Sequence, residues 1–387
     1  MVRHDAIVIG GGLNGLTAAA CLARAGASVL VLDRNSALGG AAACGEVAPG
    51  FRVARYGLGL AAMPQRLVTG LELHKHGLRF RRLDAGVTLL PDGRHHASYR
   101  DGIIHRRELQ RFSAKDADAW TRFRRDMLAA AGKLRPVLEK PMRDPSRRSL
   151  ATYRWLRGIA DRFASIDTQE LHELTRIWTL SCAEFLDGYF ESGVVKARLA
   201  SSALGGSTLG PFSPTGARFL IAPFMEEHEG GAGGVPAALL PIGGPEAIAG
   251  ALVSVILAHG GQVRREAEVT DVLMRDTRAR GVVLANGEEI HARAIISDLD
   301  LKRSFLTLFP WKALPDGFVE KIGRFRMRGV TAKVNLALDA APEFPAVPAG
   351  CPALAGGIRL GQTMEEMEAA FEDWRDGIPP SAPIIDA

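Results

Sequence analysis

The first 33 residues constrain the fold of this chain more than any other segment does. An apolar run at residues 6–9 leads directly into the pattern G-x-G-x-x-G at residues 10–15, and an alanine-rich stretch follows at 16–25. A second apolar run occupies residues 28–32. Short aliphatic and β-branched runs are typical of strands that are buried on both faces of a parallel sheet. The order therefore predicts a strand, turn, helix and strand that begin a Rossmann-like α/β domain.

The residues of this turn have separate mechanical roles. Gly10 makes the tight turn, Gly12 lets the backbone approach a pyrophosphate, and Gly15 lets the helix pack closely on the strand. The helix expected over residues 16–25 directs free backbone N–H groups and the positive end of its dipole toward that anion, and Leu13 and Asn14 of the turn are candidate cofactor-binding residues. The segment therefore predicts a dinucleotide-binding turn.

An acidic residue closes the second strand. Asp33 lies eighteen residues after Gly15, where a carboxylate can accept hydrogen bonds from a ribose 2′-hydroxyl. This charge would repel the 2′-phosphate of NADP, and Arg34 alone does not reverse that preference. The glycine pair Gly39 and Gly40 follows shortly after Arg34. A basic residue followed by such a pair resembles the extended fingerprint of FAD-binding flavoproteins, so the predicted cofactor is FAD.

From here on the sequence resembles one known family, the phytoene desaturase-like FAD-dependent oxidoreductases. It is most similar to the branch that includes pyridine nucleotide-disulphide oxidoreductase domain-containing protein 2. The resemblance covers essentially the whole chain, and its main stretches are residues 39–42, 49–51, 71–78, 183–187, 189–192 and 292–306. The name of that branch suggests thiol chemistry, but the four cysteines lie far apart and form no C-x-x-C pair. We therefore expect no dithiol centre.

The resemblance implies a fold and a division into domains. It implies a Rossmann-like, glutathione reductase-type FAD-binding domain that is discontinuous and consists of residues 1–78 and 235–310. An inserted α+β substrate domain, or cap, would consist of residues 79–234 and 311–387. In this fold a strand of the second FAD-binding segment passes the adenine, so the resemblance implies that the backbone of Val269 contacts it.

Helical spacing of apolar residues locates several helices. It predicts a helix over residues 116–134, with Ser113 at its N-cap and an end near Pro136. The expected apolar face of this helix consists of Ala117, Trp120, Phe123, Met127, Ala131 and Leu134. A second helical stretch is expected over residues 168–186. In the second FAD-binding segment, a helix with an apolar stripe is expected to begin at Pro245.

The resemblance also implies an activity: dehydrogenation or isomerisation of an apolar or amphipathic small molecule, with hydride transfer to flavin. A flavin carries the difficult chemical step itself, so no catalytic residue is predicted. Two alternatives share the fold, namely a flavin amine oxidase and a non-catalytic protein that holds lipid or protein partners, as Rab GDP-dissociation inhibitors do. Family members continue with a glycine-rich segment that contacts the flavin. No such segment is readable after Gly361, so we expect a fragment or a shortened homologue.

The charge distribution and the spacing of the histidines restrict which other partners are expected, namely nucleic acid, membranes and metal ions. The net charge of +5 does not indicate a nucleic-acid partner. Residues 122–165 hold twelve Lys and Arg against four Asp and Glu. A solvated helical face is the simpler interpretation of this stretch, and peripheral contact with an anionic membrane is the alternative. The histidine pairs His74/His76 and His95/His96 lack the spacing of metal ligands, so no metal site is predicted.

The N-terminus begins directly with a predicted strand and shows no signal-peptide pattern. The expected location is therefore the cytoplasm, with membrane association left open by the basic stretch. The sequence also leaves open the identity of the substrate, the electron acceptor and the oligomeric state.

Overall fold

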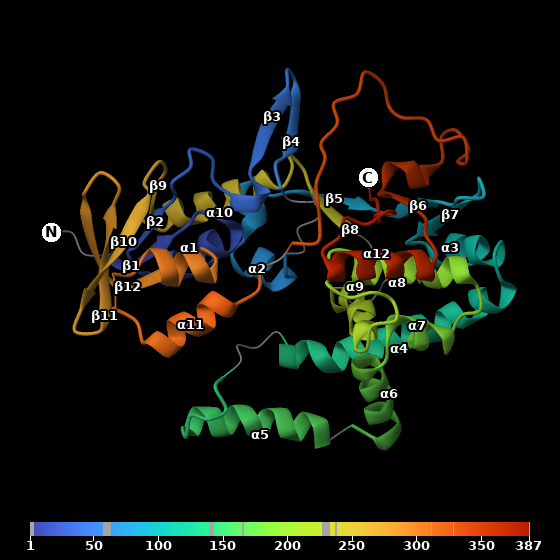
Figure 1. The fold of residues 1–387 in the computed structure, drawn as a ribbon, viewed down its shortest axis with the longest axis horizontal. Helices are drawn as coiled ribbons and strands as arrows, with labels where there is room; N and C mark the ends of the chain where they lie inside the picture. Colours follow the sequence, from blue (N-terminus) through green and yellow to red (C-terminus); the bar gives the residue numbers. More distant parts are fainter. Residues whose placement is uncertain are drawn as a thin grey trace. The chain divides into compact units, whose positions relative to one another are not determined.

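The computed structural model describes residues 4–56, 63–138, 143–164, 166–226, 233–236, 238–310, 312–327 and 329–386. The chain forms two compact units (Figure 1). Unit 1 consists of Met1–Arg82 and Leu239–Ala341, and unit 2 consists of Leu83–Ala238 and Pro342–Ala387. No helix among the described residues is long and apolar enough to cross a lipid bilayer.

Unit 1 is built on a six-stranded sheet with the order β10-β11-β12-β1-β2-β9. Its strands are β1 (His4–Ile9), β2 (Val29–Leu32), β9 (Gln262–Arg264), β10 (Val269–Arg275), β11 (Arg278–Leu284) and β12 (Glu289–Ser297). β1 pairs in parallel with β2 and β12, and β2 pairs in parallel with β9. β10, β11 and β12 form an antiparallel meander. The predicted α/β class with a Rossmann-like parallel sheet is confirmed.

Both faces of β1 are buried, which explains its uninterrupted apolar sequence. Ala6 and Val8 pack on one side with the helices α1 (Leu13–Arg24) and α10 (Glu246–Ala258). Ile7 and Ile9 pack on the other side with residues of the meander. The predicted stripe of the second-segment helix is also buried in this core, at Ile248, Leu252, Val255 and Ile256. These contacts hold the turn after β1 against a rigid sheet.

The smaller elements of unit 1 surround this sheet. They are η1 (Gly40–Ala42), β3 (Cys44–Ala48), β4 (Phe51–Ala54), α2 (Gln65–Gly70), η2 (Leu73–His76), the π-helical turn η4 (Arg303–Thr307) and α11 (Asp316–Arg324). β5 (Phe80–Leu83) and β8 (Ala238–Pro241) lie where the chain passes between the units. The sequence placed the boundaries at residues 78, 235 and 310. In the structure the second segment of unit 1 extends beyond the predicted boundary at residue 310, to Ala341. In this added part, Phe318 of α11 packs edge-on against Phe305 at a centroid distance of 5.0 Å.

Unit 2 combines a three-stranded sheet, of order β13-β6-β7, with a group of helices. Its strands are β6 (Ala85–Leu89), β7 (His95–Tyr99) and β13 (Ile358–Leu360). Its helices are α3 (Gly102–Gln110), α4 (Ala114–Leu138), α5 (Leu150–Ala164), α6 (Thr168–Thr179), α7 (Cys182–Asp187), α8 (Gly193–Leu204), η3 (Gly216–Ile221), α9 (Ala222–Glu226), η5 (Pro352–Ala355) and α12 (Met364–Asp376).

The predicted helix over residues 116–134 is confirmed as the central part of α4. Its predicted apolar face is buried in the core of unit 2, at Ala117, Trp120, Phe123, Met127, Ala131 and Leu134. The hydroxyl of Ser113 accepts a hydrogen bond from the backbone N–H of Asp116 at 3.1 Å, as an N-cap does. Pro136 does not end the helix, because α4 continues to Leu138. A proline inside a helix has no N–H to donate, so the hydrogen bond from residue 136 to the carbonyl of Gly132 is missing.

The second predicted helix is two helices. α6 ends at Thr179, and α7 begins at Cys182. Ser181 separates them because its hydroxyl accepts from the backbone N–H of Glu184 at 3.2 Å, while the Glu184 carboxylate accepts from the backbone N–H of Ser181 at 3.0 Å. This reciprocal pair is a capping box, which starts a new helix.

Candidate dinucleotide site

The turn after β1 begins with a glycine in a left-handed conformation. Gly10 has φ of 103°, a region that side chains other than hydrogen rarely adopt. Its backbone N–H donates to the carbonyl of Leu32 at 2.8 Å, so the turn is fixed to the end of β2. The chain then enters α1 at Leu13.

The N-cap residue of α1 provides no side-chain cap for the backbone N–H groups of the first turn. Gly12 is the N-cap residue, and the first turn contains no acidic side chain. A Cβ atom at Gly12 would overlap the carboxylate of Asp298, and one at Gly15 would overlap the backbone carbonyl oxygen of Gly10. At Gly15 the overlap is with backbone, so this position requires glycine, whereas at Gly12 the neighbour is the end of a side chain. The roles predicted for both glycines toward a dinucleotide stay predictions.

Asp33 is tied directly to the glycine turn. Its side chain is 7% exposed, and its Oδ2 accepts from the backbone N–H of Gly11 at 2.7 Å. Its Oδ1 accepts from the backbone N–H of Asn35 at 2.7 Å. The carboxylate therefore lies at the carboxyl end of β2 against the turn, where the predicted contact with a ribose would be made.

The second glycine pair folds back on the first turn. Gly39 and Gly40 have φ of 110° and 58°, and the backbone N–H of Gly39 donates to the carbonyl of Gly11 at 2.7 Å. A Cβ atom at Gly40 would lie 3.1 Å from the Cα atom of Gly12. Two glycine segments separated in the sequence thus build one surface. Arg34 is exposed, with a guanidinium nitrogen 4.0 Å from the carboxylate of Glu268.

The segment that leads to Val269 also lies beside the end of β2. The backbone N–H of Ala267 donates to the carbonyl of Asp33 at 2.9 Å. Val269 begins β10 and is buried. Its predicted contact with adenine stays a prediction, while its placement near Asp33 follows from this hydrogen bond.

One residue of the site was not predicted. Asp298 follows β12, and its backbone N–H donates to the carbonyl of Ile9 at 2.8 Å. Its carboxylate lies against the glycine turn, because a Cβ atom added at Gly12 would overlap its Oδ2 and one added at Gly15 would lie 3.1 Å from the same atom. Because β1 and β12 are parallel neighbours, the residue after β12 lies beside the residue after β1. An acidic residue directly after a predicted strand was the available signal.

Burial raises the pKa of the Asp298 carboxyl, and the nearby charge of Asp33 acts in the same direction. The neighbouring polar groups of Gly15, Asn14 and Gly12 oppose this shift of the pKa. Asp298 therefore places a carboxylate where an anion would bind, at the N-terminus of α1.

The described residues fit the ADP portion of a dinucleotide. The first turn of α1 supplies N–H groups, the glycines at 12 and 40 leave room for close approach, and Asp33 supplies an acceptor at the end of β2. Asp298 adds a negative charge at the N-terminus of α1, and this charge opposes the binding of a phosphate there.

Comparison with known proteins agrees with this geometry. The sequence profile of the NAD(P)-binding Rossmann-like domain matches residues 8–69. Pyridine nucleotide-disulfide oxidoreductase domain-containing protein 2 of Rattus norvegicus is 31% identical over an alignment of 409 residues, gaps included. The alignment covers 99% of this chain and 69% of that protein. This chain belongs to that family.

The family is related to the phytoene desaturases. Phytoene desaturase (neurosporene-forming) of Rhodobacter capsulatus is 28% identical over 320 residues, which cover 78% of this chain and 54% of that protein. The predicted membership of the phytoene desaturase-like oxidoreductases is confirmed.

Solved structures support the fold. A Pyrococcus furiosus protein has a TM-score of 0.52 and 18% identity, over 83% of this chain and 65% of that one. A putrescine oxidase variant has a TM-score of 0.52 and 15% identity, over 83% of this chain and 63% of that one. The chain thus spans about two thirds of the length of these proteins.

The family name mentions disulfide chemistry, but the cysteines of this member are all unpaired. They are Cys21, Cys44, Cys182 and Cys351. Burial raises the pKa of the Cys182 thiol to about 12, which disfavours the reactive thiolate. The expectation that this chain has no dithiol centre stays a prediction.

Proposed function

We propose that this protein is an FAD-dependent oxidoreductase that removes a hydride from an apolar or amphipathic small molecule. The observation that carries the proposal is the N-terminus of α1, which is bordered by two glycine segments and by Asp33. The family and its phytoene desaturase relative support the same class of chemistry.

The residues of unit 1 would hold the ADP portion of FAD. The first-turn N–H groups of α1 would bind the phosphates, Asp33 would accept from a ribose hydroxyl, and the backbone of Val269 would border the adenine. FAD supplies the acceptor for a hydride or for electrons when it is bound. The chain's own work is to bind the cofactor and to orient it, and we assign no proton-transferring residue.

The first test is the absorbance spectrum of the purified chain before and after addition of FAD. We expect a flavin spectrum that persists after removal of free FAD and is lost in Gly12→Ala and Asp33→Ala. Gly250→Ala is the matched control, because Gly250 lies in α10 with open space around its Cβ position. It should keep the flavin. Absence of a flavin spectrum from the unmodified chain at excess FAD would refute the proposal.

Product analysis separates the enzymatic alternatives. A dehydrogenase or desaturase yields an unsaturated product, whereas an amine oxidase yields peroxide and a carbonyl compound formed from an imine. A chain that binds no flavin but retains a lipid or a protein partner would instead support the non-catalytic alternative.

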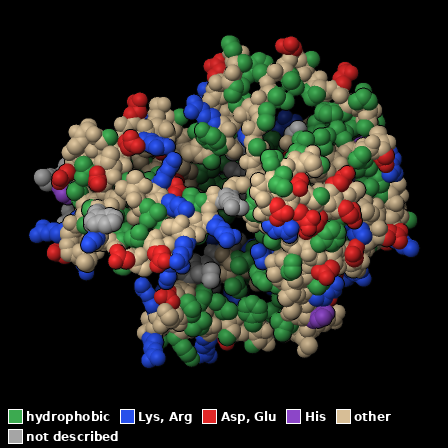
Figure 2. Space-filling view, in the orientation of Figure 1, with side chains coloured by type: hydrophobic (Ala, Val, Ile, Leu, Met, Phe, Trp, Pro, Cys, Tyr) green, Lys and Arg blue, Asp and Glu red, His purple; other side chains and the backbone are tan. Residues whose placement is uncertain are grey.

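We further propose that α5 contacts an anionic membrane surface. Its apolar side chains are exposed, with Leu150 at 65% and Tyr153 at 61%, and Arg154 and Arg157 lie among them. Figure 2 shows basic and apolar side chains together over this helix. Basic residues beside exposed apolar ones suit the interface of an anionic bilayer.

Vesicle flotation tests this contact. We expect binding to vesicles that contain phosphatidylserine, weaker binding at high salt, and little binding to phosphatidylcholine alone. Replacing Arg154 and Arg157 together by Glu should abolish flotation, whereas Arg375→Glu in α12 should not. Equal flotation with both lipid compositions would rule out the electrostatic contact.

A further inference from the structure

Buried polar atoms without a protein partner gather in one part of unit 2. Within the described residues, the side-chain atoms of this kind are Oγ1 of Thr88, both ring nitrogens of His96, Nε of Arg198 and Oε1 of Gln362. Native proteins pair nearly all buried polar groups, so each exception needs an explanation. All four residues line two cavities that share Arg198. A bound molecule in these cavities would supply the missing partners.

The topology of unit 2 explains this gathering. Arg359 of β13 is the register partner of Thr88 in β6, and Thr88 is the register partner of His96 in β7. Residues directly opposite each other across neighbouring strands share a face of the sheet. One face therefore presents Arg359, Thr88 and His96 in a row. Ser201 and Ser202 of α8 hydrogen-bond to Arg359 at 2.8 Å each, so α8 packs against this row.

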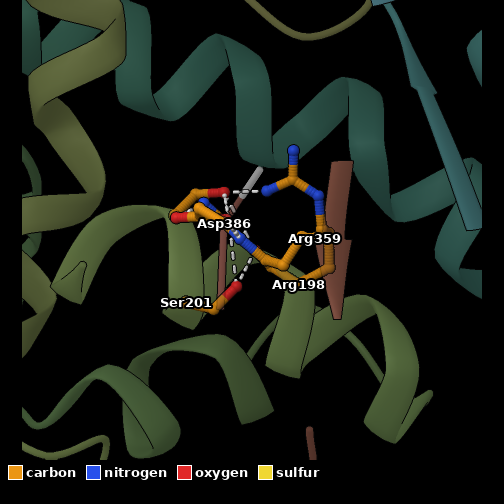
Figure 3. Close-up of polar contacts among 5 residues, drawn as sticks. Arg198, Ser201, Arg359 and Asp386 are labelled. Atoms are coloured by element: carbon orange, nitrogen blue, oxygen red, sulfur yellow. Dashed lines mark hydrogen bonds and ion pairs between the residues drawn. The ribbon is translucent and has the colours of Figure 1, made fainter. Parts of the chain in front are cut away.

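The two arginines beside α8 differ in charge compensation. Arg359 forms two hydrogen bonds to the carboxylate of Asp386, one of them 2.7 Å from Nη2 to Oδ2 (Figure 3). Arg198 donates to the hydroxyl of Ser202, and no described carboxylate lies within ion-pair distance of it. Burial, followed by the charge of Arg359, lowers the pKa of Arg198 to about 9. The charge of Asp386 acts on Arg198 in the opposite direction, but this carboxylate is already paired with Arg359. Arg198 is thus a partly buried cation without an ion-pair partner of its own among the described residues.

The cavity beside Arg198 is mainly aromatic and aliphatic. Its volume is about 140 Å³, and its walls include Leu109, Trp120, Phe123 and Phe224. An apolar cavity of about 150 Å³ accepts a benzene ring. The second cavity has a volume of about 550 Å³ and a more polar lining, which includes Thr88 and Gln362.

The histidines of the first cavity are neutral. His96 and His105 are each 2% exposed. Burial lowers the pKa of His96 to about 3 and that of His105 to about 4, and Arg198 contributes to both shifts. Neutral imidazoles offer one donor and one acceptor each, so Arg198 remains the cation of this cavity.

We propose that unit 2 binds a small carboxylic acid, whose carboxylate pairs with Arg198 and whose apolar group, of about one ring, occupies the aromatic cavity. His96 supplies a hydrogen bond to the same ligand. The pairing satisfies the Arg198 guanidinium, and it is a charge-assisted contact of the kind that discriminates strongly between a carboxylate and a neutral group. The site lies within one unit and does not depend on the dinucleotide.

Isothermal titration calorimetry with benzoate tests the proposal on the unmodified chain. Benzamide is the matched neutral probe, because it has nearly the same shape without the charge. We expect saturable binding of benzoate and binding of benzamide that is weaker by about tenfold or more, as a charge-assisted contact implies. Equal affinity for the two probes, or no saturable binding of benzoate, would overturn the proposal without any variant.

Two variants locate the contact. Arg198→Met should abolish the preference for benzoate. Arg94→Met should keep it, because Arg94 lines the second cavity but already pairs with Asp92 at 2.6 Å. Flavin content should be unchanged in both variants, so failure here is distinguishable from failure of the dinucleotide site. Retention of the benzoate preference in Arg198→Met, or its loss in Arg94→Met, contradicts the assignment of the carboxylate to Arg198.

Discussion

The carboxylate of Asp298 lies against Gly15 in the first turn of α1, where a Cβ atom added to the glycine would lie 3.1 Å from Oδ2 of Asp298. The same N-terminal region is where the glycine pattern would receive the phosphates of a dinucleotide. A protein anion and a ligand anion are thus directed to one positive site. The competition between them gives the site properties that the glycine pattern alone does not predict.

Asp298→Asn should tighten FAD binding. The amide keeps an oxygen that can accept from Gly12 or Gly15, but it removes a charge that repels phosphate. Two like charges about 4 Å apart repel by about 1 kcal/mol in water and by more in partly buried settings. We therefore expect an FAD dissociation constant lower by about fivefold or more, measured by flavin fluorescence titration. Unchanged binding would contradict the repulsion, and weaker binding would show that Asp298 supports the cofactor.

The same residue should make FAD binding depend on pH. Protonation removes the charge of Asp298, so affinity should rise as the pH falls through the raised pKa of this group. Titrations of the unmodified chain and Asp298→Asn across a pH series check this expectation. The affinity difference between them should shrink toward acid pH, and a constant difference would contradict it.

The raised pKa of Asp298 should also make the folding stability of the chain depend on pH. A raised pKa in the folded state means that folding disfavours the ionised carboxylate, so Asp298 reduces stability as the pH rises from its unfolded pKa through its folded pKa. Above that interval the reduction is complete. Melting temperatures of Asp298→Asn and the unmodified chain should therefore diverge with rising pH, in favour of the variant. If the two melting temperatures instead converge as the pH rises, the pKa of Asp298 is not raised by folding.

The sequence predicted the local part of this site and missed the part made by tertiary structure. Gly10, Gly12 and Asp33 belong to one continuous pattern, so their roles could be inferred from spacing. Asp298 reaches them only because β12 pairs with β1, a pairing that no local pattern specifies. In unit 2, the row of Thr88, His96 and Arg359 depends in the same way on strand register, and it was not predicted.

The helix boundaries show a second limit of prediction from the sequence. Apolar spacing correctly placed the buried face of α4, since that face follows from periodicity. The same periodicity continued across Ser181, where the capping box separates α6 from α7. Cap residues act through specific hydrogen bonds rather than through hydrophobic spacing, so a continuous stripe does not exclude a break.

Gly15→Ala should destabilise unit 1. A Cβ atom there would overlap the backbone carbonyl oxygen of Gly10 and would lie 3.0 Å from the Cβ atom of Asp298. Neither neighbour is the end of a flexible side chain, so the backbone must shift at a cost of about 1–3 kcal/mol. Gly250→Ala, in open space within α10, should instead be neutral or stabilising by up to about 1 kcal/mol. Denaturant unfolding of both variants tests the difference, and similar values would contradict the close packing at Gly15.

Ser181→Ala should destabilise unit 2 by removing the capping box of α7. The hydroxyl of Ser181 satisfies the backbone N–H of Glu184, and loss of such a cap costs about 0.5–2 kcal/mol. Ser146→Ala serves as the control, because Ser146 lies in an exposed turn before α5, where its hydroxyl donates to Asp144 at 2.6 Å. We expect denaturant unfolding to show a clear loss for Ser181→Ala and little change for Ser146→Ala. Ser181→Thr keeps a hydroxyl that can cap the helix, so it should recover most of the loss. No recovery would mean that the effect of Ser181→Ala comes from packing rather than from the cap.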